Sequence, residues 1–444
     1  MKLGKRWLSL LLAAMMLLGL ACVPVGAAQG QMNGAAFLAQ LDSLGRAAEG
    51  TRLVVKTADG NLPDDFGAQA RREGYNAWHV LQYADKAAAD RAYAQLAKQR
   101  GVVYVEVSRQ RTYIDPIITN EGAGNGEEAQ PMSWGAPMVQ SPQMKKALAD
   151  SGKELPVAVV AILDTGLDFT HPYFVENAHR VTGRFTTDLK NYAQDDHGHG
   201  THVAGIICDN APDNVKVSPY KVLTGGGWGD DIYIATAMCA AADDGVDVIS
   251  MSLGGPRGSI MDDAVVYAYK KGVPVVVSAG NDGWDASNNS PAGEPLAITV
   301  SAVNKDSTPA DFSNYGAVVD IAAPGGTAAN NEWDNGINST TPLFTGSYYQ
   351  KWSGTSMACP FVSAAAAVVK SLHPDYSPAD IENALKRAAR WTSGWDSAYG
   401  AGILDCMPLL NLPELGSGSG AWWEDLPAFV QWLLKYVCFG WLWM

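Results

Sequence analysis

The chain has 444 residues, of which 47% are hydrophobic and 18% are charged. This length suits two or three domains, and a composition so rich in apolar residues excludes a mainly disordered protein. Residues 129–415 hold 17 Lys and Arg against 31 Asp and Glu, which accounts for the whole formal charge of −14. Because so acidic a region repels phosphate backbones, the charge argues against binding to nucleic acids.

The first 27 residues have the pattern of a secretory signal peptide. Lys2, Lys5 and Arg6 precede an apolar run that ends at Leu20, and small residues follow at 25–27. A basic start, a short apolar core and a small-x-small site are typical of such signals. A first transmembrane helix is the alternative, but this apolar core is too short to span a bilayer comfortably. We therefore expect a secreted, extracellular protein.

Residues 28–129 are predicted to form a small α+β domain followed by a linker. Strands are expected at 52–56 and 102–107, with an Ala-rich amphipathic helix over 85–99 between them. The stretch 121–128 is polar and rich in Gly, which is typical of a linker that proteases can reach.

The cysteines do not form the framework of a disulfide-rich fold. Apart from Cys22 in the predicted signal peptide, they are odd in number and widely scattered. We expect them to act as small buried hydrophobic residues, although one disulfide between two of them is the alternative. They are Cys208, Cys239, Cys359, Cys406 and Cys438.

From residue 156 onward, predicted strands and helices alternate regularly. This alternation predicts an α/β fold with a mainly parallel sheet and helices on both faces. In such folds ligands bind beyond the carboxyl ends of the strands, so we expect the chemistry there. The strands are expected at 157–163, 215–223, 246–253 and 273–278, and helices at 230–243 and 259–271.

Four motifs stand at or near strand ends or helix starts of this region. Asp164 follows the first strand in Asp-Thr-Gly, and Asn281 comes soon after the strand 273–278. His199 opens His-Gly-Thr-His-Val-Ala-Gly, and Ser356 lies in Gly-Thr-Ser-Met-Ala-Cys-Pro, ahead of a predicted helix over 361–372. Taken singly, Asp164 could simply form a turn and Ser356 could cap a helix. Together the four supply a carboxylate, an imidazole, a hydroxyl and an amide donor, the inventory for acyl transfer by an activated serine.

The histidines at 197, 199 and 202 offer an alternative, a metal site. However, no His-Glu-x-x-His pattern is present and no Cys/His cluster completes a ligand set. We therefore expect no metal at this motif.

The combination of motifs resembles the subtilases, the subtilisin-like serine peptidases. The order Asp164, His199, Ser356 is that of the family and differs from chymotrypsin-like and α/β-hydrolase enzymes. The resemblance covers about 132–409 and implies a subtilisin-like catalytic domain over 130–415. It implies that Ser356 is the nucleophile, that His199 is the general base and then acid, and that Asp164 orients the imidazole.

The resemblance also implies residues that bind the oxyanion and the substrate. Asn281 and the backbone N–H of Ser356 would stabilise the oxyanion. Two edge strands would hold an extended protein or peptide substrate by backbone pairing, although 225–227 could also be a flexible loop. The residues assigned to substrate binding are Gly227, Trp228, Gly229, Ser252, Leu253, Gly254, Ser278, Ala279 and Gly280.

The chain departs from the family pattern in two places. The chemistry itself requires no cofactor, but well-known subtilisins bind calcium through a carboxylate soon after the catalytic Asp. Tyr173 stands at the corresponding position here, so we expect that calcium site to be absent and leave calcium elsewhere open. The second departure is an extra stretch, 325–351, of unknown role.

The two ends of the chain also receive an interpretation. Residues 28–129 resemble the inhibitory propeptides of the family, with cleavage near Ala129 and Gln130 or within 121–128; a permanent accessory domain is the alternative. Residues 416–420 form a Gly/Ser linker, and 421–444 are hydrophobic and rich in Trp. This tail is either an interfacial membrane anchor or a helix docked on its own or a partner protein.

The sequence thus predicts a secreted, self-processing serine endopeptidase inhibited by its own propeptide. One alternative is a processing protease tethered to the cell surface and dedicated to one substrate. Another is a catalytically silent binding protein on the same fold.

Overall fold

The structure is a computed structural model that describes residues 33–44, 48–113, 117–119, 133–183, 185–186, 193–327, 335–390 and 396–412. The predicted signal peptide, linker, cleavage site near Ala129 and tail lie outside these ranges.

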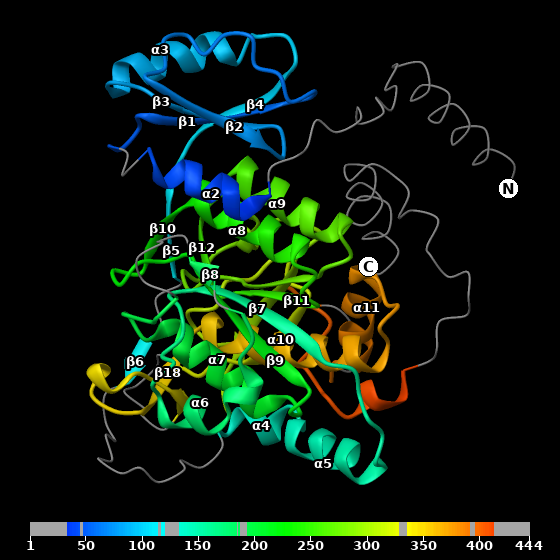
Figure 1. The fold of residues 1–444 in the computed structure, drawn as a ribbon. Coiled ribbons are helices and arrows are strands. Elements are labelled where there is room, and N and C mark those ends of the chain that lie inside the picture. The colour runs from blue at the N-terminus through cyan, green and yellow to red at the C-terminus, as the bar shows by residue number, and fades with distance from the viewer. Residues whose placement is uncertain are drawn as a thin grey trace, which may run out of the picture.

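A seven-stranded sheet with the order β16-β15-β13-β11-β7-β9-β8 forms the centre of the larger domain (Figure 1). All of its described pairings are parallel, which confirms the predicted α/β fold. Its strands are β7 (Ala158–Asp164), β8 (Phe185–Thr186), β9 (Val215–Lys221), β11 (Val248–Met251), β13 (Val275–Ser278), β15 (Ile298–Val303) and β16 (Ile321–Pro324).

Helices cover both faces of this sheet because alternate strand residues point to opposite sides. In β7, Val160 and Ile162 belong to the hydrophobic core on one face of the sheet, whereas Ala161 and Leu163 belong to the core on the other face. Figure 1 shows the two helical layers on either side of the sheet. The helices of the first layer are α4 (Gly135–Met138), α5 (Ser141–Ser151), α6 (Pro172–Glu176), α7 (His199–Asn210), α10 (Thr355–Leu372) and α11 (Pro378–Ala388), and those of the second are α8 (Asp231–Asp243) and α9 (Ser259–Lys270).

The helix α10 starts earlier than predicted, so that Pro360 lies inside it. A proline has no N–H to donate to the carbonyl four residues earlier, which here belongs to Ser356. The hydroxyl of Ser252 donates to that carbonyl instead, at 2.9 Å. Although α10 is apolar and long enough to cross a membrane, 89% of it is buried inside the domain, so it is a core helix.

The predicted strand 246–253 is wrong in its extent, because the structure divides it into two strands. The first, β11, belongs to the central sheet, and the second, β12 (Leu253–Pro256), pairs with different strands outside it. Ser252 lies between them and interacts with α10.

A small α+β domain precedes the larger one, as predicted (top of Figure 1). Its antiparallel sheet has the order β2-β3-β1-β4. Leu53 and Val55 lie in the hydrophobic core of this small domain. Val54 points to the opposite face of the sheet and packs with residues of α8 and α9 of the larger domain. The elements of this N-terminal domain are α2 (Gly34–Asp42), β1 (Arg52–Thr57), β2 (Ala70–Tyr75), β3 (Trp78–Gln82), α3 (Lys86–Leu96) and β4 (Val102–Val107).

The chain leaves the N-terminal domain as an extended segment that crosses the larger domain. Strand β5 (Gln110–Tyr113) lies between β10 (Trp228–Asp230) and β12, in a sheet that ends with β14 (Asn289–Ser290). Strand β6 (Ile117–Thr119) then pairs with β18 (Tyr349–Ser353), which also pairs with β17 (Ile337–Thr340). The extra stretch 325–351 therefore contributes β17 and the first residues of β18.

Candidate active site

Asp164 and His199 form a buried pair at one edge of the central sheet. Asp164 ends β7, and His199 is the first residue of α7. The Oδ1 atom of Asp164 lies 2.7 Å from Nδ1 of His199 and also accepts from the N–H of Thr165 at 2.7 Å. A carboxylate bound at Nδ1 favours the tautomer whose Nε2 can accept a proton.

The pair meets because α7 approaches the turn after Asp164 very closely. A Cβ atom at Gly200 would lie 2.2 Å from the carbonyl oxygen of Gly166, so only glycine fits there. We predict that Gly200→Ala separates His199 from Asp164, lowers kcat and destabilises the domain by about 1–3 kcal/mol, as overpacking does. Thermal unfolding and peptide hydrolysis measure the two effects. A variant with both values unchanged would contradict this account of the pair.

Ser356 lies at the start of α10, directly after β18. It is the second residue of the helix, is fully buried, and its hydroxyl donates to the carbonyl of Ser252 at 3.3 Å. Because Ser252 in turn donates to the carbonyl of Ser356, the two residues hold each other. The serine thus occupies a defined position at a helix N-terminus, where partial positive charge stabilises an anion.

Asn281 is held beside Ser356 by Thr355, a residue of the Gly-Thr-Ser motif for which the sequence predicted no role. Its Oδ1 accepts from the backbone N–H of Thr355 at 2.9 Å and from the Thr355 hydroxyl at 2.8 Å. With its oxygen engaged, the amide of Asn281 can offer its nitrogen as a donor next to Ser356. The only sequence signal for Thr355 is its position directly before the serine.

The buried stretch Ser278, Ala279 and Gly280 carries the chain from β13 to Asn281. The N–H of Ala279 donates to the carbonyl of Val300 at 2.9 Å, and that of Gly280 donates to the Thr355 hydroxyl at 3.2 Å. These bonds direct both N–H groups into the protein and fix the position of Asn281.

The other two histidines of the motif are packed against the surrounding protein. His202 stacks on Trp352 with ring centroids 4.6 Å apart, and its Nε2 lies 3.0 Å from the carbonyl oxygen of Gln350. Burial lowers the pKa of His202 to about 3. Burial also lowers the pKa of His197. In the part of the chain that the structure describes, no group of three or more His, Cys, Asp or Glu side chains is placed to hold a metal ion.

The depressed pKa of His202 predicts a loss of stability in acid. Between pH 3 and pH 6.5, the imidazole of the unfolded chain, with its usual pKa of 6.5, is protonated, whereas the buried imidazole of the folded protein, with a pKa of about 3, stays neutral. The free energy of unfolding therefore falls as the pH drops below 6.5, by about 2–3 kcal/mol at pH 4.5. In a Ser356→Ala background, which prevents autolysis, His202→Gln should weaken this pH dependence of the melting temperature. His179→Gln, at a side chain that is 57% exposed, is the control. If the melting temperature depends on pH equally in both variants, His202 is not the source of the acid sensitivity.

The two predicted edge strands face each other across β5. Trp228 and Gly229 pair with Thr112 and Arg111, while Leu253 and Gly254 pair with Tyr113 and Thr112, all antiparallel. We call the space between β10 and β12 the strand groove. It binds an extended chain by backbone hydrogen bonds on both sides.

The inclusion of Gly227 in the first edge strand is wrong. Gly227 lies in the turn before β10, with φ of +76°, and its N–H donates to the carbonyl of Thr224 at 2.8 Å. The strand is therefore displaced by one residue and extends to Asp230. Ser252 likewise precedes β12 and contacts α10 rather than β5.

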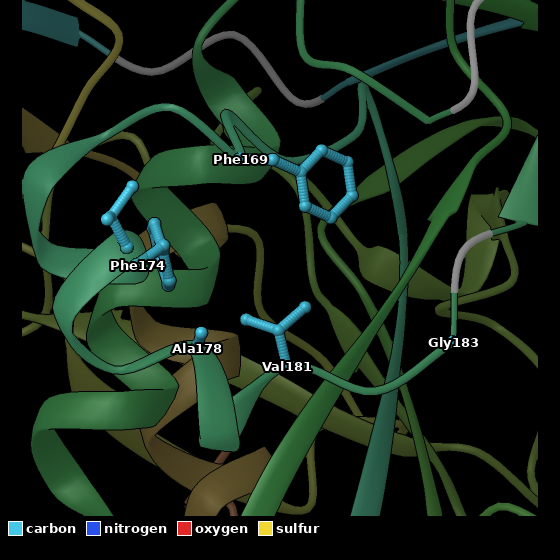
Figure 2. A pocket seen from close by; sticks show the side chains of 6 residues that line it. Phe169, Phe174, Ala178, Val181 and Gly183 are labelled. Atoms are coloured by element: carbon cyan, nitrogen blue, oxygen red, sulfur yellow. The ribbon is translucent and has the colours of Figure 1, made fainter.

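A separate cavity of about 510 Å³ lies away from these residues (Figure 2). It has no lining residue in common with the pair, the serine or the strand groove. The groove is not hollow because β5 fills it. The cavity is lined by Phe169, Phe174, Val175, Ala178, Val181 and Gly183. Tyr173, expected in place of a calcium-binding carboxylate, packs against the adjacent hydrophobic core.

The cysteines in the described ranges agree with the prediction. Cys208, Cys239, Cys359 and Cys406 are free thiols, and all four are buried. Burial raises the pKa of each thiol, which keeps it protonated and unreactive.

An α/β domain with a buried Asp–His pair, and with a buried serine at the start of a helix that packs against the helix of the histidine, defines a serine hydrolase. Residues 157–402 match the model of the Subtilase family, Peptidase_S8. The chain belongs to this family and is a subtilisin-like serine endopeptidase.

Several known proteases are similar to the chain over most of their length. Subtilisin amylosacchariticus of Bacillus subtilis subsp. amylosacchariticus is 34% identical over 340 residues, 73% of this chain and 80% of that protein. An alkaline protease of Shouchella clausii is 37% identical over 306 residues, 66% of this chain and 74% of that protein. Subtilisin Savinase of Lederbergia lenta is 37% identical over 289 residues, 62% of this chain and 98% of that protein. A solved structure, of a cold adapted subtilisin-like serine proteinase, is 30% identical with a TM-score of 0.49, covering 56% of this chain and 89% of its own.

Proposed function

We propose that the protein is secreted as a precursor, cleaves itself, and then hydrolyses peptide bonds of protein or peptide substrates. The observation that carries the proposal is the position of β5. A segment of the N-terminal region pairs with both β10 and β12, as an extended substrate would, and its last residue, Tyr113, pairs with the neighbour of Ser252, which contacts Ser356. A catalytically silent protein would have no need of the buried Asp164–His199 pair next to that groove.

The proposed reaction uses Asp164, His199, Ser356 and Asn281. The hydroxyl of Ser356 attacks the substrate carbonyl while Nε2 of His199 takes its proton, and Asp164 stabilises the imidazolium. The amide nitrogen of Asn281 and the N–H of Ser356 stabilise the oxyanion. His199 then protonates the leaving amine. Water next attacks the acyl carbon while Nε2 of His199 takes its proton, and the oxygen of Ser356 leaves and regains that proton, which releases the acid product.

We propose that the N-terminal domain inhibits the enzyme until it is removed. Besides β5, two contacts support this role. Glu106 of β4 accepts from the N–H groups of Ser259 at 2.9 Å and Ile260 at 2.7 Å, at the start of α9. Lys56 of β1 forms an ion pair with Asp263 at 2.9 Å. Together they cover the helical face beside the strand groove.

We further propose that the first self-cleavage falls between Tyr113 and Ile117. Tyr113 pairs with Leu253, next to Ser252, which contacts Ser356. Ile117 pairs with Ser353, three residues before Ser356. The bonds between Tyr113 and Ile117 therefore join two segments that each pair with a close neighbour of Ser356 or of its contact Ser252. Cleavage near Ala129 would then be a second, trimming step.

Mass spectrometry of the secreted protein incubated with a peptide library tests the proposal. New termini between Tyr113 and Ile117, together with cleaved peptides, would support it. A protein that keeps its N-terminal domain and cleaves no peptide would refute it. The same experiment also tests the tail. A protein that lacks 421–444 should cleave more of the library peptides than the full chain if the tail, as an anchor or docked helix, restricts the enzyme to one substrate.

A further inference from the structure

Arg111 of β5 is fully buried, although it belongs to a segment that lies on the surface groove of another domain. Its backbone pairs with Gly229, and its side chain contacts the Pro256 carbonyl and Asp231 of the larger domain. Burying a guanidinium is costly unless charged and polar partners compensate for the lost water. The site around Arg111 must therefore be built to receive it.

The walls of this site are backbone and glycine. The Nη1 atom of Arg111 donates to the carbonyl of Pro256. A Cβ atom at Gly255 would lie 3.0 Å from Cδ of Arg111, and one at Gly258 would lie 2.5 Å from Nη2. Because larger residues would fill this space, the two glycines give the pocket its depth.

The compensating charge is Asp231, the first residue of α8. Its Oδ2 lies 3.7 Å from Nη2 of Arg111, and the two side chains are 1% and 0% exposed. Burial raises the pKa of Asp231 to about 7, and the nearby Arg111 acts in the opposite direction. A cation in the pocket thus stabilises a carboxylate that burial otherwise disfavours.

The remaining charges near Arg111 divide between the two domains. Glu106 and Arg109 belong to the N-terminal segment and would leave with it, whereas Asp231 and Asp262 belong to the larger domain. Asp262 is engaged by Arg257 at 2.8 Å and by the Ser290 hydroxyl at 2.7 Å. Asp231 is therefore the acid that a new occupant of the pocket would meet.

We propose that Asp231, the carbonyl of Pro256 and the glycines at 255 and 258 form a subsite that selects an arginine in substrates. The selected position is the residue that pairs with Gly229, upstream of the bond that is cut. Arginine suits the pocket better than lysine because one nitrogen of its planar fork donates to the carbonyl while another lies 3.7 Å from the carboxylate, whereas a lysine has a single nitrogen for both. The inference rests on the proposed function, in which substrates occupy the strand groove as β5 does.

The test uses the processed wild-type enzyme and peptides with the sequence of residues 109–119. The residue at position 111 is Arg, Lys, Met or Glu, and each peptide is measured as a competitor of labelled casein hydrolysis, so that it reports binding whether or not it is cut. We expect the Arg peptide to bind roughly 10- to 100-fold more tightly than the Met peptide, with Lys between them and Glu weakest.

Two enzyme variants assign this preference to a residue. Asp231→Asn should reduce the Arg-to-Met ratio to within about threefold while leaving inhibition by the Met peptide unchanged. Asp243→Asn is the matched control, since this carboxylate lies at the other end of α8 and pairs with Lys271 of the larger domain at 2.7 Å, and it should keep the wild-type ratio.

The outcomes separate the inference from the proposed function. If casein is not hydrolysed, the proposed function is wrong. If casein is hydrolysed but the four peptides compete equally, or if Asp231→Asn keeps the full ratio, Asp231 only anchors the N-terminal domain and the inference is overturned. The wild-type peptide series decides this even if the Asp231→Asn variant does not fold.

Discussion

Replacement of Ser356 by Ala is expected to abolish both peptide hydrolysis and cleavage of the precursor. Without the hydroxyl no acyl-enzyme can form, and kcat should fall by about 10⁶-fold, the loss measured when the triad serine of subtilisin itself is removed. The fold should persist, because the bond that the hydroxyl donates to the Ser252 carbonyl is long, at 3.3 Å, and such a bond contributes about 1 kcal/mol.

The measurement is the mass of the secreted protein together with its rate of peptide hydrolysis. Wild-type protein should lose its N-terminal domain, whereas Ser356→Ala should keep it. Ser363→Ala is a matched control: it is another buried serine of α10, bonded to Ser250 at 2.8 Å, and should retain activity. A Ser356→Ala precursor that still matures in pure form would show that another protease does the processing.

Replacement of Asn281 by Leu has the second largest expected effect. The variant loses the amide nitrogen that we propose stabilises the developing oxyanion, and kcat should fall by about 10²–10³, the loss measured for the corresponding amide of subtilisin. KM should change little, because the interaction is stronger in the transition state than in the bound substrate.

Thr355→Val refines this experiment. It removes the hydroxyl that holds Oδ1 of Asn281 but keeps the backbone N–H bond to the same oxygen, so a smaller loss of kcat is expected. Asn288→Ala, at an exposed site, controls for the loss of an asparagine. If Asn281→Leu raised KM with kcat intact, the amide would contact the ground-state substrate and not the oxyanion.

The sequence alone determined the fold class and predicted the residues of the candidate site. Apolar runs of strand length alternating with helices predicted the parallel sheet, because this pattern follows from burial on both faces. Motifs at strand ends and helix starts predicted that Asp164, His199, Ser356 and Asn281 converge, since parallel strands end at one edge. Both signals are local, and for this reason they are visible in the chain itself.

Only the tertiary structure decided how these groups are held and what fills the groove. Arg111 and Asp231 are separated by 120 positions, and the bond from Ser252 that satisfies the Ser356 carbonyl spans 104. The displacement of β10 by one residue depends on the turn at Gly227 and on pairing with β5. Such contacts arise from loops and side chains that have no periodic pattern. The residues that form these contacts are far apart in the chain and are brought together only when the domains pack.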